Sequence, residues 1–355
     1  MTVAADIRSV GIVGAGTMGA GIAQIALEAG HDVRLCDQAP EAIGPAFERI
    51  TGGLRRRAAK LGHTDGWVDG VLERLRFETT TDAAVAGADL VIEAAVEDLL
   101  EKQRLFRSIG AAAPRHAILA TNTSALSVTA IASATDRSEQ VLGLHFFNPA
   151  AVMRLVEVVT TASTDPAVAS TASDLMTAWG KTPVRCADSP GFIVNRVNRP
   201  FTIEALRLLE AGEAGVIAID DAMRGAGFPM GPFELMDLIG IDVNLAAARG
   251  VWDGLGRPER LRPSPIQERL VAAGHVGRKA GSGFYRYDAT GRSQGIAVAT
   301  AAGATTPDAI VDRIRDAIDA EARLAADEGV ATPADIQLAL ELGAGHPPRT
   351  TPPVR

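Results

Sequence analysis

Apolar positions in the first 190 residues alternate between short runs and helical spacings. Val10-Gly-Ile-Val13 and Val33-Arg-Leu-Cys36 are apolar runs, and between them Ile22, Ile25, Ala26 and Ala29 recur at helical spacing before Gly30. Further apolar runs at 90–92, 118–120 and 141–144 are separated by helical stretches. Parallel strands joined by crossover helices produce this order, so the pattern predicts an α/β fold with a doubly wound, parallel sheet in the N-terminal domain.

The pattern changes after Cys186. Ser189-Pro190-Gly191-Phe192 predicts a helix start, and residues 193–273 carry long helical patterns with almost no strand signal. We therefore expect a first domain at 1–188 and an all-α domain at 189–288.

The C-terminal part repeats features of the helical domain at one constant offset. The first copy comprises Ile193-Val-Asn-Arg196, Glu204-Ala205, Gly212, Ile219, Ala222 and Met223, and the second Ile310-Val-Asp-Arg313, Glu321-Ala322, Gly329, Ile336, Ala339 and Leu340. This predicts a partial second helical repeat at 310–345, although two alanine-rich helices could also match by composition. Residues 289–309 are expected to form a linker, 346–355 a tail, and the chain from Gly343 onward to be disordered.

Composition narrows the functional classes. The 355 residues include 35 Lys plus Arg and 43 Asp plus Glu, a net charge of −8 with scattered basic residues, which argues against nucleic-acid binding. Cys36 and Cys186 match no metal-ligand or disulfide spacing. No signal peptide or long apolar span is recognisable. We expect a cytoplasmic protein that uses neither a metal nor a membrane.

A glycine-rich turn follows the first strand. In Gly14-Ala-Gly16-Thr-Met-Gly19 the first glycine allows the turn, the second admits a pyrophosphate, and the third permits close packing of helix and strand. Asp37 ends the second strand, where a carboxylate can bind a ribose 2′-hydroxyl and would repel a 2′-phosphate. The turn could lack a ligand, but its context favours NAD.

A proton-transfer pair is the second candidate feature. His145 ends an apolar run and Glu157 follows twelve positions later, so neighbouring strands could bring them together. A carboxylate on one ring nitrogen would leave the other to accept a substrate proton, whereas His145 alone would more often be structural. Ser124 could bind substrate or cap a helix. Asn195 could hydrogen-bond His145 or the substrate, or it could be a surface amide.

The cluster Arg55-Arg56-Arg57-Ala-Ala-Lys60 is unusual in an acidic chain. Such a run is usually a solvated helix face, but it could also bind phosphates on a substrate.

Taken together, these motifs resemble the L-3-hydroxyacyl-CoA dehydrogenase family from about Val10 to Tyr287. The motifs are Gly14-Ala-Gly-Thr-Met-Gly19, Asn122-Thr-Ser124, His145-Phe-Phe-Asn-Pro149, Leu155-Val-Glu157-Val and Pro190-Gly-Phe-Ile-Val-Asn195-Arg196. The resemblance implies a Rossmann-like NAD-binding domain and a helical substrate and dimerisation domain.

The resemblance also implies roles for single residues. It makes His145 the general base, Glu157 its orienting partner, and Ser124 and Asn195 ligands of the reacting oxygen. It implies that Lys60 contacts the CoA phosphates and that NAD contacts come from Gly14, Gly16, Thr17, Met18, Gly19, Asp37, Glu97, Lys102, Asn148 and Lys279. Ala125 departs from the family, which commonly has a second serine there, and Asp312 replaces the counterpart of Asn195 in the second repeat.

The leading hypothesis is reversible, NAD-dependent oxidation of an (S)-3-hydroxyacyl-CoA to the 3-ketoacyl-CoA, as in the β-oxidation of fatty acids, by a homodimer. One alternative is a dehydrogenase of a small hydroxy acid such as L-gulonate, which needs no CoA site. The other is a catalytically inactive NAD-binding structural or sensor protein. The sequence leaves the acyl-chain length open.

Overall fold

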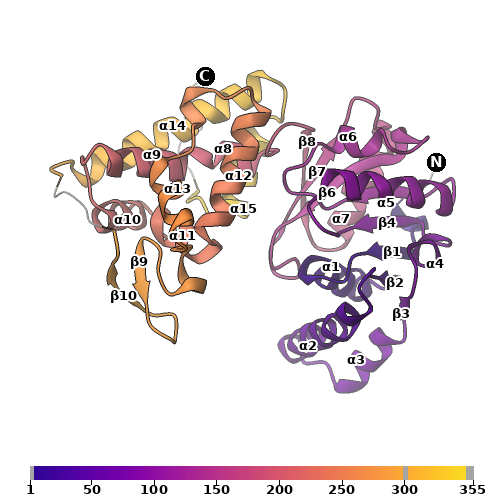
Figure 1. Ribbon diagram of the computed structural model, residues 1–355. Helices are drawn as coiled ribbons and strands as arrows, with labels where there is room; N and C mark the ends of the chain where they lie inside the picture. The colour runs from indigo at the N-terminus through magenta and orange to yellow at the C-terminus, as the bar shows by residue number, and fades with distance from the viewer. Residues whose placement is uncertain (1–3, 299–302, 349–355) are drawn as a thin grey trace. The chain divides into compact units, whose positions relative to one another are not determined.

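The computed structural model describes residues 4–298 and 303–348, which divide into two compact units (Figure 1). Unit 1 runs from Met1 to Ser189 and unit 2 from Pro190 to Arg355.

Unit 1 contains one eight-stranded sheet. Its strands are β1 Ser9–Val13, β2 Asp32–Cys36, β3 Leu75–Glu78, β4 Leu90–Glu93, β5 Ile118–Thr121, β6 Val141–Phe146, β7 Leu155–Thr160 and β8 Thr182–Ala187, in the order β3-β2-β1-β4-β5-β6-β7-β8. All neighbouring pairs are parallel except β6 and β7, which are antiparallel. The predicted doubly wound sheet is confirmed, but the expectation of parallel strands throughout was wrong for β7 and β8, which run opposite to the other strands. A short link of eight residues joins β6 to β7 without a crossover helix, so the chain must reverse direction.

Helices lie on both faces of this sheet. They are α1 Thr17–Glu28, α2 Ile43–Leu61, α3 Asp65–Leu72, α4 Thr81–Val85, α5 Leu99–Ala112, α6 Val128–Ala132 and α7 Pro166–Ala178. Ile12 of β1 belongs to the core shared with α1, α2 and α7, while a Cβ at the adjacent Gly11 would lie 2.8 Å from the carbonyl oxygen of Ala84 in α4. Because neighbouring strand residues face opposite sides, helices must cover both faces of β1.

Unit 2 is mainly helical. Its helices are α8 Val194–Val197, α9 Arg199–Glu210, α10 Val216–Gly225, α11 Pro232–Ile239, α12 Ile241–Gly254, α13 Pro265–Ala272, α14 Pro307–Asp327 and α15 Pro333–Ala344. A two-stranded antiparallel sheet, β9 Tyr285–Tyr287 and β10 Ser293–Ile296, interrupts the region expected to be a linker. Backbone N–H groups of Phe284 and Tyr285 donate to the buried carboxylate of Asp237, which fixes the start of this hairpin.

The second predicted repeat is folded. Helices α14 and α15 each begin with a Thr-Pro pair, in which Thr306 and Thr332 accept hydrogen bonds from backbone N–H groups in the first turn. Helix α15 continues to Ala344, so the expectation of disorder from Gly343 was wrong for its first residues. Residues 349–355 of the predicted tail and 299–302 of the predicted linker lie outside the described residues.

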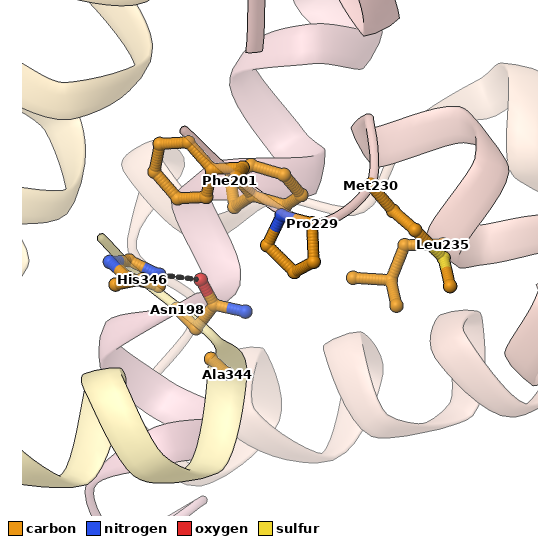
Figure 2. A pocket seen from close by; sticks show the side chains of 8 residues that line it. Asn198, Phe201, Pro229, Met230, Leu235, Ala344 and His346 are labelled. Atoms are coloured by element: carbon orange, nitrogen blue, oxygen red, sulfur yellow. Dashed lines mark hydrogen bonds between the residues drawn. The ribbon is translucent and has the colours of Figure 1, made fainter. Parts of the chain in front are cut away.

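The end of α15 packs beside the first copy (Figure 2). His346 Nε2 lies 2.7 Å from the side-chain oxygen of Asn198, and the His346 ring meets the edge of Phe228. The adjoining pocket holds about 80 Å³ and is lined mainly by Phe201, Phe228, Pro229, Met230 and Leu235. A volume of a few water molecules is too small for a dinucleotide or an acyl-CoA.

Candidate active site

The predicted site residues of unit 1 gather at the carboxyl ends of the strands. The glycine turn follows β1, Asp37 follows β2, Ser124 follows β5, and His145 lies near the end of β6. Strand order reverses between β1 and β4, and open α/β sheets bind ligands at such a switch point.

The three glycines of the turn have different surroundings. Gly14 has a φ of +111°, and a Cβ at Gly19 would lie 1.8 Å from the carbonyl oxygen of Gly14. A Cβ at Gly16 would meet nothing within 4 Å. Gly14 and Gly19 are therefore required by the fold, whereas the space at Gly16 fits the close approach of a dinucleotide pyrophosphate to the backbone.

Asp37 supports this turn directly. Its carboxylate accepts hydrogen bonds from the backbone N–H groups of Ala15, at 2.7 Å, and Ala39, at 2.9 Å. These bonds hold the carboxylate at the end of β2, where the sequence analysis expected it to meet a ribose hydroxyl.

His145 and Glu157 are partners across the antiparallel pair of β6 and β7. His145 Nδ1 lies 2.5 Å from Glu157 Oε2, and the side chains are 7% and 0% exposed. A carboxylate at Nδ1 selects the tautomer with a proton on that nitrogen and assigns proton acceptance to Nε2. The Phe147 ring lies 4.5 Å from the imidazole, measured between ring centres, and helps to hold its position.

Ser124 lies beside a second carboxylate. Glu97 Oε1 accepts hydrogen bonds from the Ser124 backbone N–H, at 2.9 Å, and from the Ser124 and Thr123 hydroxyls, at 3.2 and 2.7 Å. Burial acts to raise the pKa of Glu97, but the Thr123 hydrogen bond and the Lys102 charge outweigh it and lower that pKa below its usual value. An ionised Glu97 therefore positions the Asn122 to Ser124 turn.

Lys102, which the sequence analysis expected to contact NAD, is buried beside Glu97. Its side chain is 1% exposed, and its ammonium lies 2.5 Å from Glu93 Oε1 and 3.4 Å from Glu97 Oε2. The ammonium, buried between two carboxylates, helps to position Glu97, and the contact of Lys102 with NAD stays a prediction.

Two positioning residues were not identified from the sequence. Buried Glu93 joins Lys102 to the Thr121 hydroxyl, and the Asn122 side-chain oxygen accepts the backbone N–H of Phe146, next to His145. A charged or amide residue at the end of an apolar strand, as at Asp37, was the signal that could have revealed both.

The remaining predicted residues lie in a groove of unit 1, in helix α1 or in unit 2. Thr17, Lys60 and Asn148 line one groove of unit 1, described below, and Met18 lies in the first turn of α1. Asn195 lies in α8, where its backbone carbonyl accepts a hydrogen bond from Arg199, and Lys279 pairs with Asp242 at 2.8 Å.

No group of His, Cys, Asp and Glu suited to a metal ion occurs within residues 4–298 and 303–348. In the same part of the chain, no helix is long and apolar enough to cross a membrane.

The sheet, the glycine turn and the histidine and glutamate pair define the class as a nucleotide-binding oxidoreductase fold. Residues 9–189 match the family model for the NAD-binding domain of 3-hydroxyacyl-CoA dehydrogenase, and residues 191–287 match that for its C-terminal domain. The chain belongs to the 3-hydroxyacyl-CoA dehydrogenase family.

Individual relatives agree with this assignment. The chain is 46% identical over 285 residues to 3-hydroxyadipyl-CoA dehydrogenase of Escherichia coli (strain K12), covering 80% of this chain and 60% of that relative. It is 43% identical over 288 residues to the mitochondrial hydroxyacyl-coenzyme A dehydrogenase of Homo sapiens, covering 79% of this chain and 91% of the human protein.

Solved structures show the same fold. The crystal structure of 3-hydroxybutyryl-CoA dehydrogenase from Escherichia coli K12 matches with a TM-score of 0.84 and 36% identity, covering 95% of this chain and 89% of that one. The (S)-3-hydroxybutyryl-CoA dehydrogenase of Ralstonia eutropha matches with a TM-score of 0.76 and 37% identity over 79% of this chain and 99% of its own.

Proposed function

We propose that this protein catalyses the reversible, NAD-dependent oxidation of (S)-3-hydroxyacyl-CoA to 3-ketoacyl-CoA. The observation that carries the proposal is the buried pair of His145 and Glu157 at the ligand-binding edge of an NAD-binding sheet. A structural or sensor protein needs the glycine turn but has no need of a buried base.

NAD, held at the glycine turn and Asp37, would supply the nicotinamide that accepts a hydride from C3 of the substrate. His145 Nε2 accepts the proton of the 3-hydroxyl group, and Glu157 stabilises the imidazolium that forms. Ser124, held by Glu97, and Asn195 are assigned to binding the reacting oxygen. Glu97 and Lys102 act on this site through the Asn122 to Ser124 turn.

A cationic groove in unit 1 supports a CoA ester over a small free hydroxy acid. It holds about 810 Å³, and its lining includes Arg49, Arg56, Arg57, Lys60, Arg154 and Lys181. An L-gulonate-sized substrate has no phosphates with which such a surface could pair, whereas a CoA tail has three.

The decisive assay follows NADH formation from a series of (S)-3-hydroxyacyl-CoA esters that includes 3-hydroxybutyryl-CoA and 3-hydroxyadipyl-CoA, with L-gulonate in parallel. We expect turnover of CoA esters alone. Turnover of L-gulonate would support the small-acid alternative, and NAD binding without any turnover would support an inactive protein.

Assembly as a homodimer in the cytoplasm is part of the proposal. Helix α14 of the same chain packs on α9 and α10, so we expect the dimer to use the apolar side chains left exposed on α10 to α12, namely Ile217, Leu238, Ile239 and Val243. Light scattering tests the dimer: the mass of one chain would contradict it, and Leu238→Glu should weaken it.

A further inference from the structure

The residues that line the cationic groove include a buried lysine, Lys181. Lys181 precedes β8, its residue is 9% exposed, and it lines the groove with five arginine and lysine residues. Its ammonium donates hydrogen bonds to the backbone carbonyls of Ala150, at 2.6 Å, and Met153, at 2.9 Å. An ammonium has three N–H donors, so these two bonds leave one that can point to a ligand.

The segment that Lys181 holds lies between the two halves of the proton-transfer pair. Residues 147–154 connect β6, which carries His145, to β7, which carries Glu157, and they include Asn148. The backbone N–H of Thr182, next to Lys181, donates to Arg154 at the other end of this link. One lysine thus contacts both the groove and the β6–β7 link.

The positive charges around Lys181 favour the binding of an anion. Six cations and one carboxylate, that of Glu28, line the groove. Glu28 accepts a hydrogen bond from Gln24 and lies 3.4 Å from Arg57. Burial lowers the pKa of Lys181 to about 8; the charge of Glu28 opposes this shift and the charge of Arg57 adds to it. A phosphate in the groove would supply the missing negative charge.

We propose that Lys181 is a positioning residue that couples phosphate binding in the groove to the β6–β7 link and hence to His145 and Glu157. The proposal rests on the proposed function, in which the phosphates belong to the CoA tail. Phosphate bound to Lys181 fixes its ammonium against the carbonyls of Ala150 and Met153. Binding energy from the remote tail then raises turnover instead of only lowering KM.

The test compares two substrates in the complete enzyme: (S)-3-hydroxybutyryl-CoA and (S)-3-hydroxybutyryl-pantetheine, which lacks the phosphates. In the unmodified protein we expect kcat to be about 10-fold higher for the CoA ester. Equal kcat values for the two esters would overturn the coupling. Oxidation of neither ester would instead overturn the proposed function, so the two failures are distinguishable.

Variants then locate the coupling. In Lys181→Met the kcat ratio between the two esters should fall towards 1, and Lys181→Arg should restore part of it. Arg56→Gln is the matched control, because Arg56 is an exposed cation of helix α2 that lines the same groove. It should raise KM for the CoA ester and preserve the kcat ratio. Equal losses of kcat for both esters in Lys181→Met would show a structural role and overturn the proposal.

Because a buried lysine can be needed for folding, a second measurement uses the unmodified protein. Added 3′,5′-ADP, which carries phosphates without the thioester, should raise kcat for the pantetheine ester several-fold. No increase, at concentrations where 3′,5′-ADP competes with the CoA ester, would overturn the proposal.

Discussion

Arg196 and Glu321, 125 residues apart, form a buried ion pair: Nε donates to Oε1 at 2.8 Å, and the side chains are 0% and 1% exposed. The equivalent positions of the repeat form the reciprocal pair, Arg313 with Glu204, at 3.1 Å. In a two-fold symmetric homodimer, residue i of one subunit contacts residue j of the other, and residue j of the first contacts residue i of the second. The two ion pairs therefore join matching positions of the two copies reciprocally.

Loss of Glu321 should destabilise this interface strongly. Glu321→Ala removes the buried carboxylate that pairs with Arg196 and Arg260, and we expect a loss of about 3 kcal/mol in the free energy of unfolding. The exposed pair of Arg115 and Asp136 is the control, since Asp136→Ala should cost less than about 1 kcal/mol. Urea unfolding measures both, and equal costs would contradict the role of burial.

Glu157→Gln should lower kcat by about 100-fold, because a neutral amide no longer stabilises the His145 imidazolium. The affinity for NAD should change less than about 2-fold, since Glu157 serves proton transfer. Steady-state rates and an NAD titration measure the two effects. Near-normal turnover in this variant would exclude the pair as the proton-transfer machinery.

Two glycines of the turn should separate ligand binding from folding. In Gly16→Ala the added methyl group enters open space, so the thermal midpoint should stay close to that of the unmodified protein while NAD binding weakens. In Gly19→Ala the same group would overlap the Gly14 carbonyl, so stability should fall as well. Thermal unfolding and NAD titration measure both variants. An equal loss of stability in Gly16→Ala and Gly19→Ala would contradict the separation of binding from folding.

The charge of Lys181 predicts a pH dependence. Because its pKa is lowered to about 8, the ammonium is present below that pH and is lost as the pH rises through it. For the CoA ester, kcat/KM should therefore fall above pH about 8, while the pantetheine ester should show no such fall. If kcat/KM of Lys181→Met for the CoA ester still decreased above pH about 8, another group would be responsible for the decrease.

Stability should change in the opposite sense. The unfolded chain holds the Lys181 proton up to a higher pH than the folded chain, so the cost of burying this charge is fully present below pH about 8 and is relieved above it. The unmodified protein should therefore become more stable between about pH 8 and 10, and Lys181→Met should lack this gain. Urea unfolding at both pH values measures the difference.

The sequence by itself determined the elements with strong local signals. The apolar runs of β1, β2, β4, β5 and β6, the glycine turn, and the repeat that became α14 and α15 were all recognisable from spacing, because each depends on nearby residues. Short β3, the β9–β10 hairpin and the reversed direction of β7 were not, since pairing with distant strands decides them.

The tertiary structure decided which polar residues act together. The sequence around Lys102 and Glu93 does not show that these two side chains form a buried ion pair. The contact of Lys181 with Ala150 and Met153 joins segments about 30 residues apart. Burial removes such groups from water and makes their pairing essential, and burial is a property of the packed chain. Spacing therefore predicted His145 and Glu157, whereas only packing showed what holds their strands in place.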